Sequence, residues 1–294
     1  MLGLVGALSM ACAPLGYSTA ELETLGASDF HLAPEQAQRF LEDAMGCAGS
    51  SDPFLRDLIG YDGIMTILRG EKVDRDVVRT LTLELMETLE QPNEVVDRRY
   101  GKRRGGFQAS FLTLYLVEFA RWDRIDPILS DVERARLVDL AAAELRDVTD
   151  YRGFDQRVGW RHHVAHAADL TLQVALNPGI DDDQRRLLAE AIVSQVNPAE
   201  IHFYVYGEPG RLALPLLYLA FGSEWSAEEM TGLLEPLKGS VEAWEDAYND
   251  QAALARLHNT RGFLQSILLR TEGQEHPNLM ALREAAQNAL AALP

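Results

Sequence analysis

The densest group of side chains that could do chemistry lies between residues 150 and 169. Its candidate ligand-binding residues are Arg152, Asp155, Trp160, His162, His166 and Asp169. If one helix covers residues 162–169, then at about 100° per residue His162, His166 and Asp169 lie within roughly 60° of one another. Two imidazoles and a carboxylate on one helix face form a ligand set suited to Zn, Mn or Fe. His163 points elsewhere on such a helix, and we expect it to be more exposed.

Three interpretations of this segment stay open. A divalent metal held by His162, His166 and Asp169 would indicate a metal-dependent hydrolase or lyase, with Asp155 or Glu208 moving the proton. A groove for a small molecule or a protein partner would use the same side chains, with Trp160 stacking on a sugar or another ring. A buried hydrogen-bond network would use the imidazoles and the carboxylate only to tie a loop to its neighbours. No complete metalloenzyme signature such as His-Glu-x-x-His is present,.

Other polar clusters along the chain have a functional and a structural interpretation. Glu208, in a tight turn, is either a general acid or base or a cap for the helix that follows. His258, Asn259 and Arg261 either extend the groove or open a late helix, with Asn259 or Thr260 as the cap. The basic run 97–104 is either an anion- or partner-binding loop or a solvated connection,.

Composition excludes several classes of function. The 294 residues include 45 Asp and Glu against 27 Lys and Arg, so this acidic chain has a net charge of −18 and repels nucleic-acid phosphates,. We therefore expect no nucleic-acid partner. No stretch approaches the roughly 20 apolar residues that a transmembrane helix needs. The sequence also lacks a nucleophile elbow, a phosphate-binding glycine loop and a dinucleotide motif, so a divalent metal is the one cofactor that it suggests,.

The amino terminus suggests a compartment. Residues 1–11 are apolar, with the small residues Ser9 and Ala11 before Cys12, which is typical of the end of a signal peptide,. The segment is short and has no basic residue, so either the true start lies upstream or the segment is an apolar first helix of a cytoplasmic protein. Export would place the protein in the periplasm or cell envelope. There Cys12 and Cys47 could form a disulfide, whereas in the cytosol they would be two separate thiols.

The elements that must position these residues are helices. Apolar residues such as Leu81, Leu85 and Leu89 recur every three or four positions along most of the chain,. Helices are expected at 35–45, within 52–90, around 111–119, from Ser130 onward, and at 161–176, 183–196, 208–221, 227–237, 241–254, 259–269 and 278–293. Residues 202–206 are the only strand-like run, and we interpret them as a single extended piece or a loop. The prediction is one all-helical domain over 12–294, made of packed antiparallel helix pairs as in an α-solenoid (HEAT/ARM-like helical repeat) or an α/α toroid.

The motif Arg152-Gly-x-Asp155, followed by Gly159-Trp160-x-His162-x-x-Ala165-His166-x-x-Asp169, resembles the signature of an uncharacterised bacterial family, domain of unknown function 2785. Tyr206-Gly-Glu208 and His258-Asn259-Thr260-Arg261 resemble its later blocks, so the likeness runs from about 51 to 269. The resemblance implies an all-helical fold and, in members from Gram-negative bacteria, export with an early cysteine like Cys12. It implies no activity, so whether the chain is an enzyme stays open. We expect a binding protein with a polar groove, and a metal-dependent hydrolase or lyase is the alternative.

Overall fold

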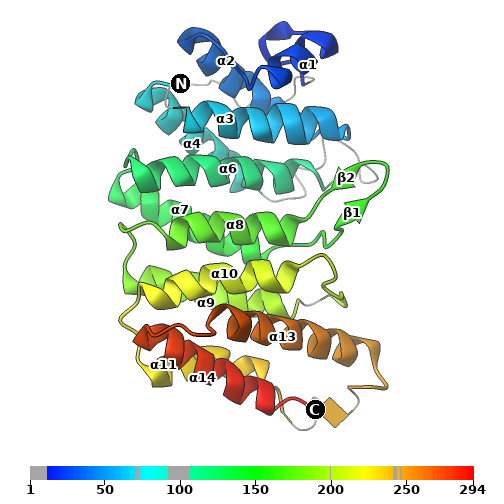
Figure 1. The fold of residues 1–294 in the computed structure, drawn as a ribbon, viewed down its shortest axis with the longest axis vertical. Coiled ribbons are helices and arrows are strands. Elements are labelled where there is room, and N and C mark those ends of the chain that lie inside the picture. Colours follow the sequence, from blue (N-terminus) through cyan, green and yellow to red (C-terminus); the bar gives the residue numbers. More distant parts are fainter. Residues whose placement is uncertain (1–11, 71–72, 92–105, 199, 241–243, 246) are drawn as a thin grey trace. The chain divides into compact units, whose positions relative to one another are not determined.

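A computed structural model describes residues 12–70, 73–91, 106–198, 200–240, 244–245 and 247–294 (Figure 1). The chain divides into two compact units. The first unit comprises residues up to 130 together with 152–166, and the second comprises 131–151 and 167–294. The described residues are mostly helical, with helices packed in pairs, which confirms the predicted helical class. The prediction of a single domain over 12–294 is not tested by this division.

The first unit is built around one helix that is almost completely buried. Its elements are η2 (Pro14–Gly16), α1 (Thr19–Ala27), α2 (Pro34–Ala44), η3 (Met45–Cys47), the π-helix η4 (Phe54–Asp62), α3 (Gly63–Arg69), α4 (Arg75–Leu89) and α6 (Gln108–Ile125). The elements η4, α3 and α4 all pack against α6. Every residue of α6 from Gln108 to Ala120 is buried, so α6 is the core of this unit.

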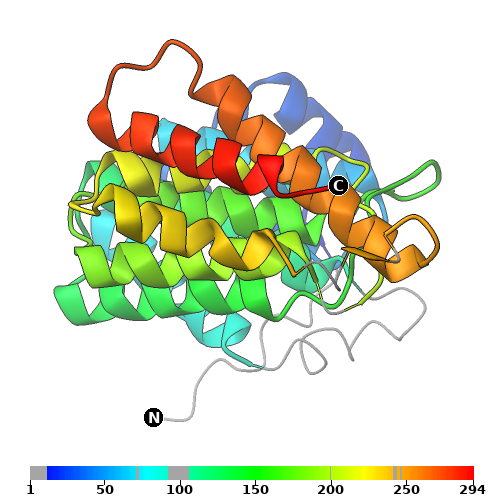
Figure 2. The ribbon, with the colours of Figure 1, turned by 90° about the horizontal axis from the view of Figure 1, so that it is seen from below.

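The second unit alternates its helices between two rows. Its elements are α7 (Asp131–Arg146), α9 (Asp182–Val196), α10 (Glu208–Phe221), α11 (Ala227–Leu234), η5 (Glu235–Leu237), α13 (Gln251–Arg270) and α14 (Pro277–Ala291). In one row α9 packs against α7 and α11, and α11 packs against α14; in the other α10 packs against α13. Contacts of α9 with α10 and of α13 with α14 join the rows. Figure 2 shows α13 and α14, in orange and red, lying against each other.

Side-chain caps fix several of these helix starts. Asp181 accepts a hydrogen bond from the Gln184 backbone N–H at 2.9 Å, and the Gln184 side chain accepts from the Asp181 N–H at 3.0 Å, so α9 begins with a capping box,. Asp250 accepts from the Ala253 N–H at 2.8 Å at the start of α13,. These bonds satisfy backbone donors that the first turn of a helix leaves without partners.

A hairpin of two strands, each two residues long, precedes the helix that contains His163 and His166. Strands β1 (Phe154–Asp155) and β2 (Gly159–Trp160) pair antiparallel, with Phe154 opposite Trp160. Helix α8 (His163–Ala175) follows, and its first turn belongs to the first unit. The sequence did not predict this hairpin, because two-residue strands leave no alternating pattern to detect.

Most predicted helices are confirmed within two residues, but one region of the prediction is wrong. Separate helices were expected at 241–254 and 259–269. The structure has one continuous helix, α13, which Asp250 caps; residues 244–245 are helical, residues 247–249 form a turn, and residues 241–243 and 246 lie outside the described part. Residues 202–206 form no strand, as expected of a single extended piece or a loop. The candidate signal segment 1–11 and the basic run 97–104 also fall outside the described residues and stay predictions.

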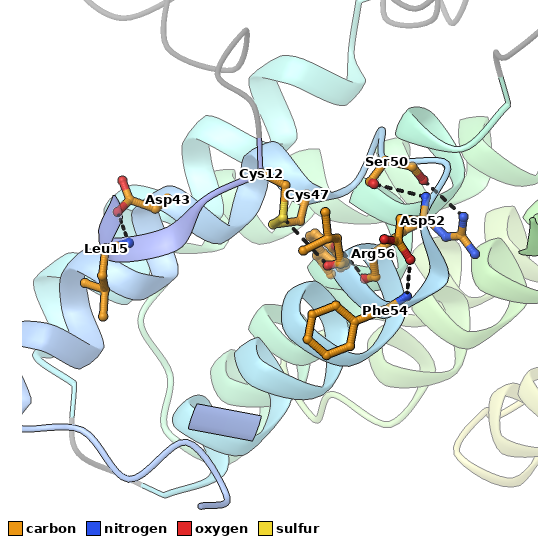
Figure 3. Close-up of a disulfide and its surroundings, with 10 residues drawn as sticks. Cys12, Leu15, Asp43, Cys47, Ser50, Asp52, Phe54 and Arg56 are labelled. Carbon is orange, nitrogen blue, oxygen red and sulfur yellow. Dashed lines mark hydrogen bonds between the residues drawn. A yellow bond between two sulfur atoms is a disulfide. The ribbon is translucent and has the colours of Figure 1, made fainter. Parts of the chain in front are cut away.

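Cys12 and Cys47 form a disulfide in the first unit, with Cα atoms 4.5 Å apart (Figure 3). Cys47 is completely buried at the end of η3. Next to the disulfide, the Leu15 backbone N–H donates to the Asp43 carboxylate at 2.8 Å. Both contacts fasten the segment that begins at residue 12 to α2 and η3. Of the two alternatives that the sequence left open for these cysteines, the structure has the disulfide.

Within the described ranges, no helix is both long and apolar enough to cross a membrane.

Candidate functional site

Asp155 shapes the turn of the hairpin. One of its carboxylate oxygens accepts from the backbone N–H groups of Arg157 at 2.8 Å and Val158 at 3.2 Å. These bonds lower the pKa of Asp155, the Arg157 bond most strongly, so the carboxylate stays charged,. Gly159 has φ +73°, a left-handed conformation that favours glycine,. The Asp155 carboxylate thus holds the hairpin turn, a use that the sequence interpretation did not consider.

A continuous chain of aromatic rings leads from the hairpin surface into the first unit. The Trp160 ring stacks on His162 with 4.8 Å between centroids and 24° between planes, and Phe154 lies 5.1 Å from Trp160. His162 and His166 are 6.3 Å apart, and His166 meets the edge of Phe111 at 5.0 Å. At the outer end, Phe154 is 48% exposed and Trp160 is 39% exposed. We call Phe154, Trp160 and His162 the aromatic face.

His162 sits in an unusual backbone conformation. Its φ is +51°, and α8 begins only at the next residue, His163. A positive φ is uncommon for a residue with a side chain, although histidine tolerates it better than most. The prediction that His162 lies on the same helix face as His166 and Asp169 is therefore wrong. The expectation for His163 is also wrong, because His163 is buried, with 5% exposure.

Ser110 on α6 fixes His166 and the end of the hairpin together. The Ser110 hydroxyl donates to the Arg161 carbonyl at 2.5 Å, and His166 Nδ1 lies 2.9 Å from that hydroxyl and 3.0 Å from the Ser110 carbonyl. A carbonyl can only accept, and the hydroxyl proton is already donated to Arg161. Nδ1 of His166 therefore carries a proton and donates. In this arrangement His166 is part of a buried hydrogen-bond network.

Arg56 contacts the turn of the hairpin from the buried interior of the first unit. It was not among the residues predicted from the sequence. Its side chain has 0% exposure and lies between the rings of Phe107 and Phe111, at 4.3 and 4.5 Å,. The guanidinium donates to the carbonyls of Ser50 at 3.1 Å and Val158 at 3.0 Å. It also forms a bidentate pair with Asp57, from Nε at 2.8 Å and Nη2 at 3.2 Å,. Burial raises the pKa of Asp57, and the charge of Arg56 partly offsets that rise,.

The described residues contain no group of three or more His, Cys, Asp and Glu side chains that could hold a metal ion. Of the predicted triad, His166 and Asp169 lie three positions apart on α8, and the ring of His162, just before the helix, is 6.3 Å from that of His166,. The metal-dependent hydrolase or lyase therefore stays a hypothesis without support from the geometry.

Asp169 belongs to the second unit, where it pairs with Arg211 of α10 at 3.1 Å. Burial raises the pKa of Asp169 to about 6, although Arg211 acts to lower it,. The Asp169 side chain is 19% exposed and that of Arg211 is 49% exposed. This carboxylate therefore changes its charge near neutral pH.

His258 and Asn259 bind the segment between α9 and α10. The Asn259 side-chain carbonyl accepts from the Tyr204 N–H at 2.9 Å, and its amide donates to the His202 carbonyl at 2.9 Å. His258 Nε2 lies 3.0 Å from the Tyr204 carbonyl and therefore carries the proton that it donates,. Asn259 and Thr260 are buried in the middle of α13. The predicted capping role for these two residues is wrong, because α13 begins eight positions earlier, at Gln251.

Glu208 and Arg261 have structural contacts in the second unit. Glu208 is buried at the first position of α10, and its carboxylate accepts from the N–H of Tyr206, which precedes the helix, at 2.8 Å. Arg261 donates to the carbonyl of Pro294 at 2.5 Å. Near Glu208, the rings of Tyr151 and His202 stack at 5.2 Å. Burial lowers the pKa of His202, with Glu208 and Glu200 acting against it,.

The candidate residues therefore fall into two groups. The first unit brings together Trp160, His162 and His166, while Asp155 forms the turn beside them and Arg152 is exposed at the hairpin base. The second unit holds Asp169, Glu208, His258, Asn259 and Arg261. A sequence signal for the missed Arg56 does exist: Arg56, Ile59, Gly60 and Gly63 follow the spacing of a buried helix face,.

The family model described as "Protein of unknown function (DUF2785)" matches residues 102–269. The match covers more than half of the chain, so the protein belongs to this family. It confirms the resemblance seen in the sequence. Neither the curated proteins nor the solved structures include a match to this chain.

Proposed function

We propose that this protein binds a ligand through the aromatic face of the hairpin, and that the ligand is a saccharide. One observation carries the proposal: Phe154 and Trp160 are 48% and 39% exposed, although their rings contact each other on a hairpin that the buried Arg56 holds through the Val158 carbonyl. Large exposed apolar surfaces with a rim of polar residues are typical of binding sites. A flat indole face fits the C–H face of a pyranose, and the exposed Arg152 and Arg157 can donate to hydroxyl groups,.

The conformation of His162 supports this proposal. His162 has a positive φ and its imidazole stacks on one face of Trp160, which holds the indole ring in place and leaves the other face for a ligand. Backbone conformations of this kind carry a cost and concentrate at functional sites. The buried network around Ser110 and His166 keeps the next turn in place. We infer that the hairpin is preorganised for a ligand, since fixed side chains lose little entropy on binding.

We propose that the scaffold is an α-solenoid of the HEAT/ARM type. The alternation of packing in the second unit, in which α9 contacts α7 and α11 while α10 contacts α13, supports it,. An α/α toroid would share this local packing and stays the alternative. We also propose export to the periplasm or cell envelope, supported by the disulfide, which oxidising compartments favour,. A cytoplasmic location would leave Cys12 and Cys47 reduced in freshly lysed cells, which thiol alkylation measures.

The ligand proposal is tested on an array of immobilised oligosaccharides, including glycan fragments of the bacterial cell wall. We expect the wild-type protein to bind at least one saccharide, and Trp160→Ala to lose about tenfold or more in affinity. Trp160→Phe keeps an aromatic face and should retain part of the binding. Tyr248→Ala, an exposed aromatic residue of the second unit, is the matched control and should bind like the wild type. Binding that is absent, or that survives Trp160→Ala unchanged, would contradict the proposal.

A further inference from the structure

The segment from Ile201 to Tyr206 joins α9 to α10 in the second unit (Figure 1). Tyr204 is buried, whereas Ile201, Val205 and Tyr206 are 59%, 64% and 39% exposed. One side chain of the segment is thus anchored in the protein while its neighbours on both sides face solvent. The segment has no neighbouring strand in the described structure.

One edge of this segment is already occupied by side chains of α13. Asn259 bonds to the Tyr204 N–H and the His202 carbonyl, and His258 donates to the Tyr204 carbonyl. The Asn259 side-chain amide, through one N–H and its carbonyl oxygen, makes the two bonds that the N–H and C=O of one residue on a neighbouring strand would make,. Tyr204 is held from a second direction, since its hydroxyl donates to the Gln195 carbonyl at 2.8 Å. The segment is therefore fixed in an extended conformation without belonging to a sheet.

The opposite edge carries the backbone groups of Phe203 and Val205. In an extended chain the N–H and C=O of one residue point to the same edge, and those of the next residue point to the other edge. The groups of His202 and Tyr204 face α13, so those of Phe203 and Val205 face away from it. Within the described residues, these four groups have no hydrogen-bond partner. An edge with free donors and acceptors at every second residue is complementary to another extended backbone.

We propose that the open edge of residues 201–206 binds an extended peptide segment of a partner protein by strand addition. The partner forms hydrogen-bonded pairs with Phe203 and Val205, and its alternate side chains lie along Ile201 and Val205. Main-chain bonds supply affinity in this mode of recognition, and the exposed apolar side chains favour apolar residues at every second position of the partner. The exposed carboxylate of Glu200 and the net charge of −18 favour a peptide with basic ends,.

A labelled peptide of sequence Lys-Thr-Val-Thr-Val-Thr-Val-Lys, blocked at both ends, is the probe, and fluorescence anisotropy with the full chain is the measurement. Val205→Pro removes one donor from the open edge and keeps a conformation that suits an extended segment, because the residue before proline is restricted to extended geometry. Val205→Thr is the matched control, since it keeps the N–H and the branched shape. We expect saturable binding that Val205→Pro weakens about tenfold or more and that Val205→Thr changes less than about threefold.

Peptides methylated on alternate backbone nitrogens provide an independent measurement on the unmodified protein. Methylation of the two nitrogens that face Phe203 and Val205 should abolish binding, whereas methylation in the other register should leave it within about threefold. Absence of saturable binding, equal loss in both Val205 variants, or equal loss in both methylation registers would overturn the proposal. Sedimentation velocity shows whether a second copy takes the edge instead: a wild-type dimer that Val205→Pro converts to a monomer would also overturn it.

Discussion

The Arg56 guanidinium donates to the Val158 carbonyl at 3.0 Å across 102 positions of the sequence. This bond joins the π-helix η4 to the turn of the hairpin that presents the aromatic face. Its donor is a fully buried cation whose remaining bonds go to Asp57 and the Ser50 carbonyl. The geometry of the hairpin thus depends on a residue far from the motif in which the hairpin lies.

Replacement of Arg56 by methionine should destabilise the first unit by about 2–4 kcal/mol, because two carbonyls lose the buried guanidinium that donates to them and the partly exposed Asp57 carboxylate loses its partner,. Arg56→Lys keeps the charge but cannot form the bidentate pair with Asp57, and we expect an intermediate loss of stability. Urea denaturation followed by circular dichroism measures both. Arg79→Met on α4 is the control for a half-buried arginine of the same unit. A loss below about 1 kcal/mol for Arg56→Met would show that the buried cation does not fix the hairpin.

Gly60→Ala should be one of the most damaging small substitutions in the chain. A Cβ at this position would overlap the Tyr115 hydroxyl oxygen, which donates to the Arg56 carbonyl at 2.9 Å. We expect a loss of about 3 kcal/mol, measured by thermal unfolding. Gly232→Ala on α11, where an added Cβ meets no atom within 4 Å, is the control and should change stability little. Tyr115→Phe in the Gly60→Ala background should recover part of the loss, since it removes the nearest atom.

Asp169 should make stability depend on pH in an unusual direction. Because its pKa is raised to about 6 by burial, the folded protein holds this proton more tightly than the unfolded chain does,. The contribution of Asp169 to stability is therefore present at low pH and lost as pH rises toward and through about 6. Compared with Asp169→Asn, the wild type should lose about 1 kcal/mol between pH 5.5 and 7.5 in urea denaturation. A difference that is constant over this range would contradict the raised pKa.

Reduction of the disulfide should destabilise the first unit. In the chain-entropy model, a bond between cysteines 35 positions apart is worth about 3–4 kcal/mol,. We expect dithiothreitol to lower the melting temperature of the wild type to that of the Cys12→Ser, Cys47→Ser double variant. The double variant itself should not respond to dithiothreitol. If the wild type and the variant melt at the same temperature without reductant, the disulfide contributes no stability.

The helices could be predicted from the sequence because their apolar positions repeat regularly and their first turns have polar caps. Glu208–Phe221 has the predicted bounds. Asn259 shows the limit of this reasoning: as a good capping residue it suggested a helix start, yet its amide bonds to a backbone 55 and 57 positions away. Local patterns do not contain such distant partners.

The candidate site was predicted in part. The segment 152–166 does bring Trp160, His162 and His166 together, as the density of polar residues suggested. The predicted triad failed at His162, because one residue with positive φ delays the start of α8 and changes where that ring points. Arg56 escaped notice because a charged residue is normally placed on the exposed side of a helix.

The position of Arg56 has a practical consequence for work on the family. A fragment trimmed to the matched span of 102–269 would contain the hairpin but lack Arg56, which donates to it. The fragment would also lack α14, which packs against α11 and α13. Such a fragment would expose two surfaces that the longer chain conceals, and aggregation of the fragment would say nothing about what these proteins do. Recombinant studies of relatives should keep the sequence from the first cysteine through the last helix.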